Sequence, residues 1–306
     1  NLVFFPSLLL FTSGIVLHVV PGFAPQLAES PLYNGLFGLA LLWAVTLLNV
    51  LGLKRAKWVQ NVGGIGTLVV MAQVVCGGAI AWWRNGSATP MTAASLLPEF
   101  SSAATLSIFA ILILAFTGFE LGPLLGDEIR NSARSVRRAI YISGLLIAAI
   151  YVAGTIALLV ALPAERISAI SGIPEAMAAI GLRSGIPLFG AIAALLLAIT
   201  SAGGLGAWIT GTARLPFVLG LGHYLPERLG AIHPRYGSPH VALLVQAGAV
   251  SLALLAAISG STIHEAYILL IDMTVALNCA VWVYIFAALP VLRWRAAGRN
   301  EGVALI

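Results

Sequence analysis

Eight long hydrophobic runs, separated by short polar segments, dominate the pattern of residues along the chain. Each run approaches or exceeds the roughly 20 residues that an α-helix needs to cross a bilayer core about 30 Å thick. None shows the alternation over about ten residues that is typical of a membrane β-strand. The pattern therefore predicts an all-α polytopic membrane protein with eight transmembrane helices. We expect them at residues 2–20, 33–53, 59–83, 103–125, 139–162, 186–213, 241–258 and 266–292.

The composition supports a membrane protein and excludes a soluble or disordered one. Of the 306 residues, 60% are hydrophobic and only 9% are charged, whereas an ordinary globular domain carries about 25% charged residues. The net charge of +5 lies in the short polar segments. It therefore indicates contact with the lipid bilayer and not with nucleic acid. The two cysteines, Cys76 and Cys279, lie inside runs and are interpreted as packing residues.

The positive residues are distributed unequally between alternate polar segments. Thirteen Lys and Arg residues lie in segments that would share one side, and only Arg84, Arg166 and Arg183 would lie on the other. Cytoplasmic loops of membrane proteins carry such an excess of positive charge. The asymmetry predicts a multi-pass protein of the cell membrane with both ends of this chain in the cytoplasm. Because Asn1 directly precedes a hydrophobic run, we also expect the chain to be a fragment that starts partway through a longer protein.

The fourth run contains residues that an uninterrupted transmembrane helix avoids. Thr117 and Gly118 precede Glu120, and Gly122 and Pro123 follow it. Glycine and proline weaken a helix, and in lipid the freed backbone groups need partners or a polar cavity. A carboxylate beside such a break is typical of a binding site in a transporter. The alternative is a kinked helix in which Glu120 only pairs with a neighbour.

Two further runs carry polar residues of interest. Trp208 lies in the middle of the sixth run, although membrane tryptophans favour the interface. In the same run, the hydroxyls of Thr200 and Ser201 could coordinate a hard cation; alternatively, they bond to carbonyls of their own helix. In the eighth run, Asp272 could gate an outer vestibule or carry a proton, or it could only reach back to the interface.

Three stretches of the chain together resemble the amino acid–polyamine–organocation (APC) superfamily of secondary transporters. Residues 116–120 are similar to the core of that family's broken sixth helix. Residues 128–140 resemble the basic stretch that follows it, and residues 206–240 resemble the eighth helix with its following loop. The resemblance covers essentially the whole chain.

The resemblance implies a particular fold. The eight runs would be family helices three to ten, within a single transporter domain over residues 1–306. Residues 1–100 would then hold the last three helices of a first five-helix repeat, and residues 101–292 a complete, inverted second repeat. The sixth family helix would be broken near residues 117–119. The family's first helix, which holds the substrate carboxylate, is not among these residues.

The resemblance also implies roles for individual residues. Glu120 would begin the inner half of the broken helix, at a position that some relatives link to proton coupling. Asp272 is assigned to coupling or gating from its position in the eighth run alone. Cationic amino-acid exchangers of the superfamily carry a tryptophan where this chain has Leu114, which argues against a clamp for a guanidinium group. The expected substrate-binding residues are Phe116, Thr117, Gly118, Phe119 and Trp208.

The leading hypothesis is secondary active transport of amino acids or related amines by alternating access. No cofactor is expected beyond a coupling ion, either H⁺ or Na⁺. The alternatives are an intramembrane enzyme acting on lipid or peptide, which would need a nucleophile–base pair or a metal cluster, and an ion channel. Neither a filter sequence nor a complete catalytic motif is evident in the chain. The sequence leaves the substrate, the coupling ion and the oligomeric state open.

Overall fold

The described part of the protein consists of helices and connecting turns. The computed structural model describes residues 2–19, 25–92, 109, 112, 117–118, 131–163, 172–186, 188–260 and 262–298. The α-helices in these ranges are α1 (Phe4–Val16), α2 (Pro31–Val50), α3 (Leu53–Asn85), α7 (Ser132–Ala161), α8 (Gly172–Ser184), α9 (Phe189–Thr212), α10 (Arg214–Leu221), α11 (His240–Ser259) and α12 (Ile263–Gly298). Two short 3₁₀ helices, η1 (Pro25–Leu27) and η4 (Glu227–Gly230), lie between them.

The helices confirm that the chain is a multi-pass membrane protein. Six helical stretches in the described ranges are long and apolar enough to cross a bilayer: those of α2, α3, α7, α9 with α10, α11 and α12. The first expected span is shorter than predicted, because α1 has only 13 residues. Most of the fourth expected span, at 103–125, lies outside the described residues. The count of eight spans and the inverted repeat therefore stay predictions.

The starts of α2 and α12 follow directly from local sequence. The Ser30 hydroxyl accepts a hydrogen bond from the backbone N–H of Tyr33, and Pro31 occupies the first turn of α2. Before α12, the N–H of Thr262 donates to Glu265 at 3.1 Å, and the N–H of Glu265 donates to the Thr262 hydroxyl at 3.2 Å. Both arrangements satisfy N–H groups that a helix start leaves unpaired.

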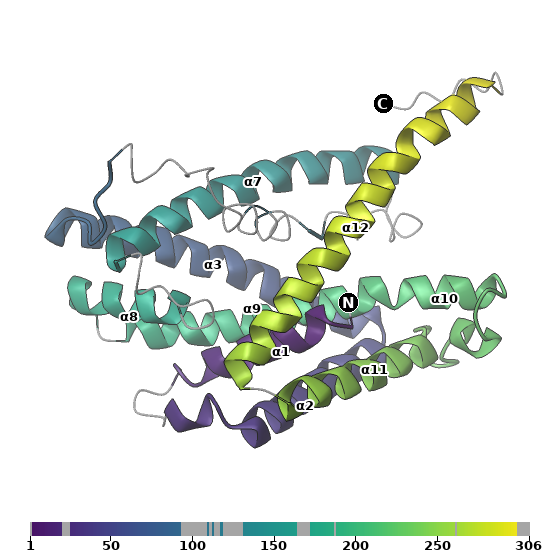
Figure 1. Cartoon of the computed structure of the whole chain (residues 1–306), viewed down its shortest axis with the longest axis horizontal. Coiled ribbons are helices and arrows are strands. Elements are labelled where there is room, and N and C mark those ends of the chain that lie inside the picture. Colours follow the sequence, from purple (N-terminus) through teal and green to yellow (C-terminus); the bar gives the residue numbers. More distant parts are fainter. Residues whose placement is uncertain are drawn as a thin grey trace.

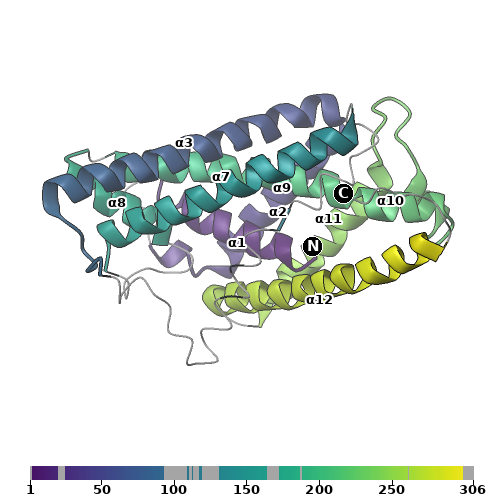
Figure 2. The same cartoon turned by 90° about the horizontal axis from the view of Figure 1, so that it is seen from above.

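Helix α9 joins two groups of helices (Figure 1). One buried cluster, which includes Leu9, Leu42 and Leu254, joins α9 to α1, α2, α11 and α12. A second cluster, which includes Val70 and Met177, joins α9 to α3, α7 and α8. Figure 2 shows α3 and α7 running side by side on one face of the bundle, with α12 along the other. Residues of α9 therefore contact most of the other described helices.

The contact between α3 and α9 depends on two glycines. A Cβ added at Gly63 would lie 2.7 Å from the Cα of Gly203, and a Cβ at Gly203 would lie 2.6 Å from the Cα of Gly63. Real Cβ atoms do not approach so closely, so the backbones meet directly here. Small residues allow this close packing of helices in membranes.

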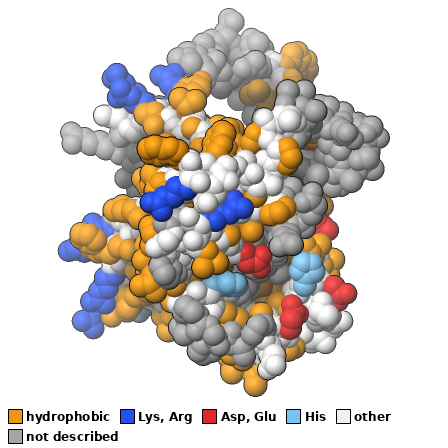
Figure 3. Space-filling model, turned by 90° about the vertical axis from the view of Figure 1, so that its left-hand side faces the viewer, with side chains coloured by type: hydrophobic (Ala, Val, Ile, Leu, Met, Phe, Trp, Pro, Cys, Tyr) orange, Lys and Arg blue, Asp and Glu red, His pale blue; other side chains and the backbone are white. Residues whose placement is uncertain are grey.

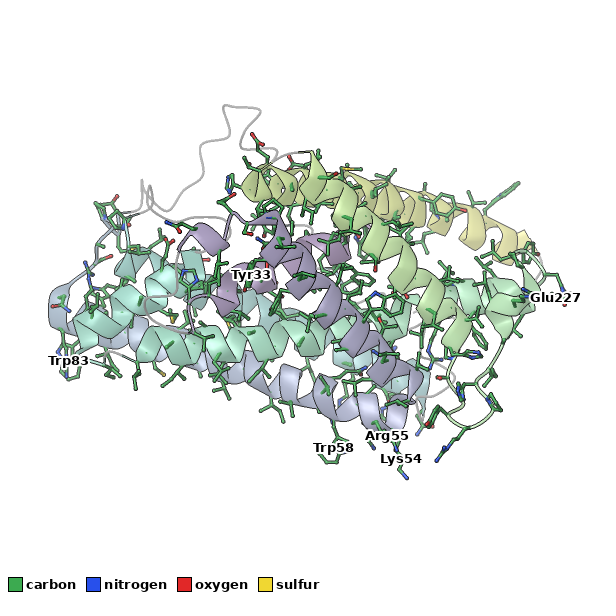
Figure 4. The ribbon with its side chains drawn as sticks, turned by 90° about the horizontal axis from the view of Figure 1, so that it is seen from below. Tyr33, Lys54, Arg55, Trp58, Trp83 and Glu227 are labelled. Carbon is green, nitrogen blue, oxygen red and sulfur yellow. The ribbon has the colours of Figure 1, made fainter. Side chains whose placement is uncertain are left out.

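Several basic residues lie together at one end of the bundle. Lys54 and Arg55 lie where α3 begins, near the end of α2, and Arg214 lies at the start of α10. We call this the basic end. At the opposite end, Asn85 donates to the carbonyl oxygen of Arg183 at 3.2 Å, and Figure 4 shows that α3 runs the length of the bundle between the two ends. Between the ends, α3, α7 and α12 expose many large hydrophobic side chains, as expected where helices meet lipid tails. Figure 3 looks onto the end of the bundle opposite the basic end, where hydrophobic side chains lie among polar and charged ones.

Candidate substrate site

Gly118 lies beside the indole ring of Trp208 on α9. Its φ of 113° falls in the region that favours glycine, so the backbone is not helical at this residue. A Cβ at Gly118 would lie 3.4 Å from Cζ2 of Trp208 and 4.0 Å from its Cη2. Two residues that the sequence analysis assigned to one site are therefore neighbours, although 90 positions separate them. Thr117, assigned to the same site, is half-buried next to Gly118.

The ring of Phe4 packs against Trp208 in the same site. The ring centroids of Phe4, at the start of α1, and Trp208 are 5.1 Å apart, with an interplanar angle of 59°. This tilted arrangement is a favourable geometry for an aromatic pair. Trp208 is half-buried, so part of its surface is still accessible. Such rings attract an ammonium group placed over their faces, which suits a substrate with an amino group.

Phe4 was not predicted as a site residue from the sequence. A phenylalanine in a hydrophobic run carries no signal of its own, because its importance depends on which helix it faces. The remaining predicted residues of the broken helix, Phe116, Phe119 and Glu120, lie outside the described residues. Their roles stay predictions.

The Thr200 hydroxyl bonds to a carbonyl of its own helix, which is the alternative to a cation site. Its hydroxyl donates to the carbonyl oxygen of Leu197 in its own helix at 2.8 Å. Its methyl carbon Cγ2 points at α3, where a Cβ added at Gly66 would lie 2.8 Å away. The hydroxyl is thus used within α9, and Ser201 beside it is half-buried. A cation site at Thr200 and Ser201 stays a prediction.

Asp272 lies on an exposed face of α12. Its side chain is exposed, whereas Leu270 and Thr274, two positions away on either side, are buried. Residues two positions apart lie on opposite sides of a helix, so Asp272 faces away from the core that α12 shares with α1 and Trp208. Its predicted role in gating or coupling stays a prediction, but the described contacts give it no place beside Gly118 and Trp208.

A partly buried polar cluster joins three helices close to the basic end. Gln60 on α3 donates to the Thr210 hydroxyl on α9 at 2.9 Å, and this hydroxyl donates to the side-chain oxygen of Asn49 on α2. The Asn49 amide in turn donates to the carbonyl of Val45 at 3.0 Å. This cluster was not predicted from the sequence, where charged, hydroxyl and aromatic residues stood out in the hydrophobic runs. The amide of Asn49 inside a hydrophobic run was the feature of the sequence that could have predicted the cluster.

A pocket of about 90 Å³ adjoins this polar cluster. Successive residues of an α-helix are rotated by about 100°. Thr210, which lines the pocket, therefore lies about 200° around α9 from Trp208, and Arg214 lies on the same side as Thr210. The pocket and the Trp208 site thus occupy opposite faces of one helix. The described residues that line the pocket are Asn49, Thr210, Arg214, Gly237, Ser238, Pro239 and Leu243.

Comparison with known proteins places the whole chain among transporters. The family model described as amino acid permease matches residues 1–303. An uncharacterized transporter of Legionella pneumophila is 27% identical over 306 residues, which is all of this chain and 65% of that protein. A probable agmatine/putrescine antiporter of Lactococcus lactis is 29% identical over 65% of this chain and 42% of its own length. A serine/threonine exchanger of Bacillus subtilis is 24% identical over 88% of this chain and 58% of its own length.

These matches agree with the resemblance found in the sequence. The chain spans about two thirds or less of the length of these curated relatives. The family and the relatives are named as permeases, transporters, antiporters and exchangers, and not as enzymes. Because the family model covers nearly every residue, the chain belongs to the amino acid permease family.

Proposed function

We propose that the protein is a secondary active transporter that carries amino acids or related amines across the cytoplasmic membrane by alternating access. Its membership of the amino acid permease family supports a transporter of this substrate class. The named relatives carry agmatine or putrescine in one case, and serine or threonine in another. These four molecules differ in charge and size, and all carry an amino group. We therefore propose an amino group as the shared feature that the site recognises.

The observation that carries the proposal is the contact of Gly118 with Trp208 beside Phe4. An ammonium group over the indole face would gain about 0.5–2 kcal/mol from the ring. The non-helical φ of Gly118 breaks the regular helix beside this ring, and a break of this kind is typical of the substrate site of a transporter. Together these features place two aromatic rings beside a break in regular helical backbone.

We propose further that Glu120 couples transport to a proton, and that the chain comprises the last three helices of a first five-helix repeat and a complete, inverted second repeat. Glu120 lies two positions after Gly118, so a proton on its carboxylate would lie near bound substrate. The repeats would divide the chain into residues 1–100 and 101–292. Na⁺ coupling through Thr200 and Ser201 has less support, because the Thr200 hydroxyl bonds to its own helix.

Transport by the purified protein in proteoliposomes tests the proposal. Uptake of radiolabelled putrescine, agmatine, serine and threonine is measured with and without the same compound inside the vesicles. We expect saturable uptake of at least one compound. In the variant Trp208→Ala we expect uptake at low substrate concentration to fall by about tenfold, because a loss of about 1.4 kcal/mol changes affinity tenfold.

Trp83→Ala is the matched control, because Trp83 is 92% exposed at the opposite end of the bundle. It should transport like the unchanged protein. Trp208→Phe keeps an aromatic ring and should lose less activity than Trp208→Ala, which separates a binding role from misfolding. Equal uptake by Trp208→Ala and Trp83→Ala would exclude the proposed site, and a linear dependence of uptake on concentration would exclude a carrier.

A further inference from the structure

The pocket at the basic end lies apart from the proposed substrate site and has a different chemistry. It lies between the end of α2, the start of α10 and the turn before α11, and Arg214 is the charged residue among its described lining residues. Asn49 and Ser238, which also line it, are 5% and 6% exposed. None of the described lining residues is acidic. The pocket therefore combines polar and apolar lining residues with one arginine, and it is separate from Trp208.

The turn that forms one wall is held firmly against α2 and α3. The Ser238 hydroxyl donates to the carbonyl oxygen of Val50 at 2.6 Å. The carbonyl oxygen of Tyr236 lies 3.0 Å from the position of a Cβ added at Gly52, whose φ is 100°. These contacts connect the turn to the junction between α2 and α3. The pocket wall thus has a fixed shape in the folded protein.

More positive charge surrounds the pocket. The guanidinium carbons of Arg55 and Arg235 lie 6.0 Å and 5.6 Å from the ring centroid of Tyr236, which directly precedes the lining residue Gly237. Lys54 is exposed beside Arg55. The start of α11 adds the partial positive charge of a helix N-terminus. Its first turn has no acidic residue and no side-chain cap to offset this charge. The nearby acidic residue Glu227 is engaged by His223 at 3.0 Å.

The position of the pocket relative to the membrane favours a lipid over a free anion. Figure 4 shows Lys54, Arg55 and Trp58 together where α3 begins, with Trp58 pointing outward. Trp58 is 67% exposed, and the apolar residues Val62 and Ile65 further along α3 are also exposed. An exposed tryptophan between basic residues and an apolar surface is typical of the level of lipid headgroups. Basic pockets between helices at this level bind anionic headgroups.

We propose that this pocket binds the headgroup phosphate of an anionic phospholipid. Arg214 contacts the phosphate from inside the pocket, and Arg55 and Arg235 attract it from the rim. The acyl chains of the lipid then extend along the exposed apolar face of α3. The site is independent of the proposed transport mechanism, because it lies on the face of α9 opposite Trp208.

Thermal unfolding of the full-length purified protein in detergent tests the site without any measurement of transport. A ligand that binds only the folded protein raises its unfolding temperature. Phosphatidylglycerol is the probe, and phosphatidylcholine is the neutral lipid for comparison. We expect phosphatidylglycerol to raise the unfolding temperature by about 3 °C more than phosphatidylcholine. In Arg214→Gln this difference should fall by more than half, and in Arg214→Lys most of it should remain.

Arg228→Gln is the matched control, because Arg228 is an exposed residue of η4 at the same end and does not line the pocket. It should keep the full difference between the two lipids. If Arg214→Gln does not fold, Arg55→Gln replaces it, and the difference should fall by a smaller amount. The proposal would be overturned if Arg214→Gln, or Arg55→Gln in its place, kept the same difference in unfolding temperature between the two lipids as Arg228→Gln. Equal protection by 10 mM inorganic phosphate alone would overturn the lipid as the ligand.

Discussion

Two carboxylates lie within the predicted membrane-spanning runs, and their neighbours along the chain differ. Glu120 follows Gly118, the residue that lies against Trp208. Asp272 is exposed on α12, away from the core around Trp208. A charged carboxylate at the centre of a bilayer costs about 2.5–3.5 kcal/mol on insertion scales. A carboxylate beside the substrate has a functional reason to be there, whereas one on an outer face needs only to reach water.

The substitutions Glu120→Gln and Asp272→Asn are therefore expected to differ. Each removes the charge and nearly keeps the shape of the side chain. Glu120→Gln should abolish uptake driven by a pH gradient, because its amide takes up no proton, whereas Asp272→Asn should keep at least about half of this uptake. Both variants are reconstituted, and uptake is measured at several external pH values. A normal pH response of Glu120→Gln would refute its role in coupling, and a lost response of Asp272→Asn would assign coupling to α12 instead.

At the scale of residues, the sequence predicted both partners of one contact and missed partners in others. Trp208 and Gly118 were both found, because tryptophan in mid-membrane and glycine beside a carboxylate are unusual. Phe4 was missed, since a phenylalanine in an apolar run looks like any other packing residue. The Thr210–Asn49 bond joins residues 161 positions apart. Such a pair becomes visible only when the faces that meet are known.

At the scale of helices, α3 and α9 are held together by backbone contact at Gly63 and Gly203. A methyl group at Gly63 would have to push the backbone of α9 away, because no flexible side chain stands between the two helices. Overpacking of this kind costs about 1–3 kcal/mol. The neighbouring Gly64 is exposed, and a Cβ there meets no atom within 4 Å.

Gly63→Ala and Gly64→Ala should therefore have opposite effects on stability. Gly63→Ala is expected to lower the unfolding temperature through the clash with Gly203. Gly64→Ala should leave it unchanged or raise it slightly, because alanine stabilises a helix by about 1 kcal/mol relative to glycine. Thermal unfolding of the two purified variants in the same detergent compares them directly. An equal loss in both would show that the direct contact of α3 with α9 does not determine stability.

The sequence predicted helices well where a long hydrophobic run is enough to identify them, and poorly where a short helix depends on packing. The expected span at 241–258 matches α11 (His240–Ser259) within one residue at each end. Helix α8 was not predicted, because its 13 residues include Pro174, Glu175 and Arg183 and are too few to cross a membrane. It forms where Met177 and Ile180 are buried against α3 and α9. Tertiary packing, which the local pattern does not contain, stabilises this helix.

At the scale of the whole molecule, the ends of the bundle have different charge. Lys54, Arg55 and Arg214 lie at the basic end, where the turn before α11 also docks. At the opposite end, the guanidinium of Arg183 donates to the carbonyl oxygen of Val160 at 2.9 Å. Positive residues are retained on the cytoplasmic side of membrane proteins. We therefore propose that the basic end, and with it the lipid pocket, faces the cytoplasm.

Labelling of single cysteines in intact cells tests this orientation. The chain has two cysteines, so Cys76→Ala with Cys279→Ala gives a cysteine-free background. Asn85→Cys places a thiol at the opposite end, and Glu227→Cys places one at the basic end, where the Glu227 side chain is 80% exposed. A membrane-impermeant maleimide should label Asn85→Cys in intact cells, and should label Glu227→Cys only after the cells are broken. The reverse result would place the basic end outside the cell, which would contradict the proposed orientation and move the lipid pocket to the outer leaflet.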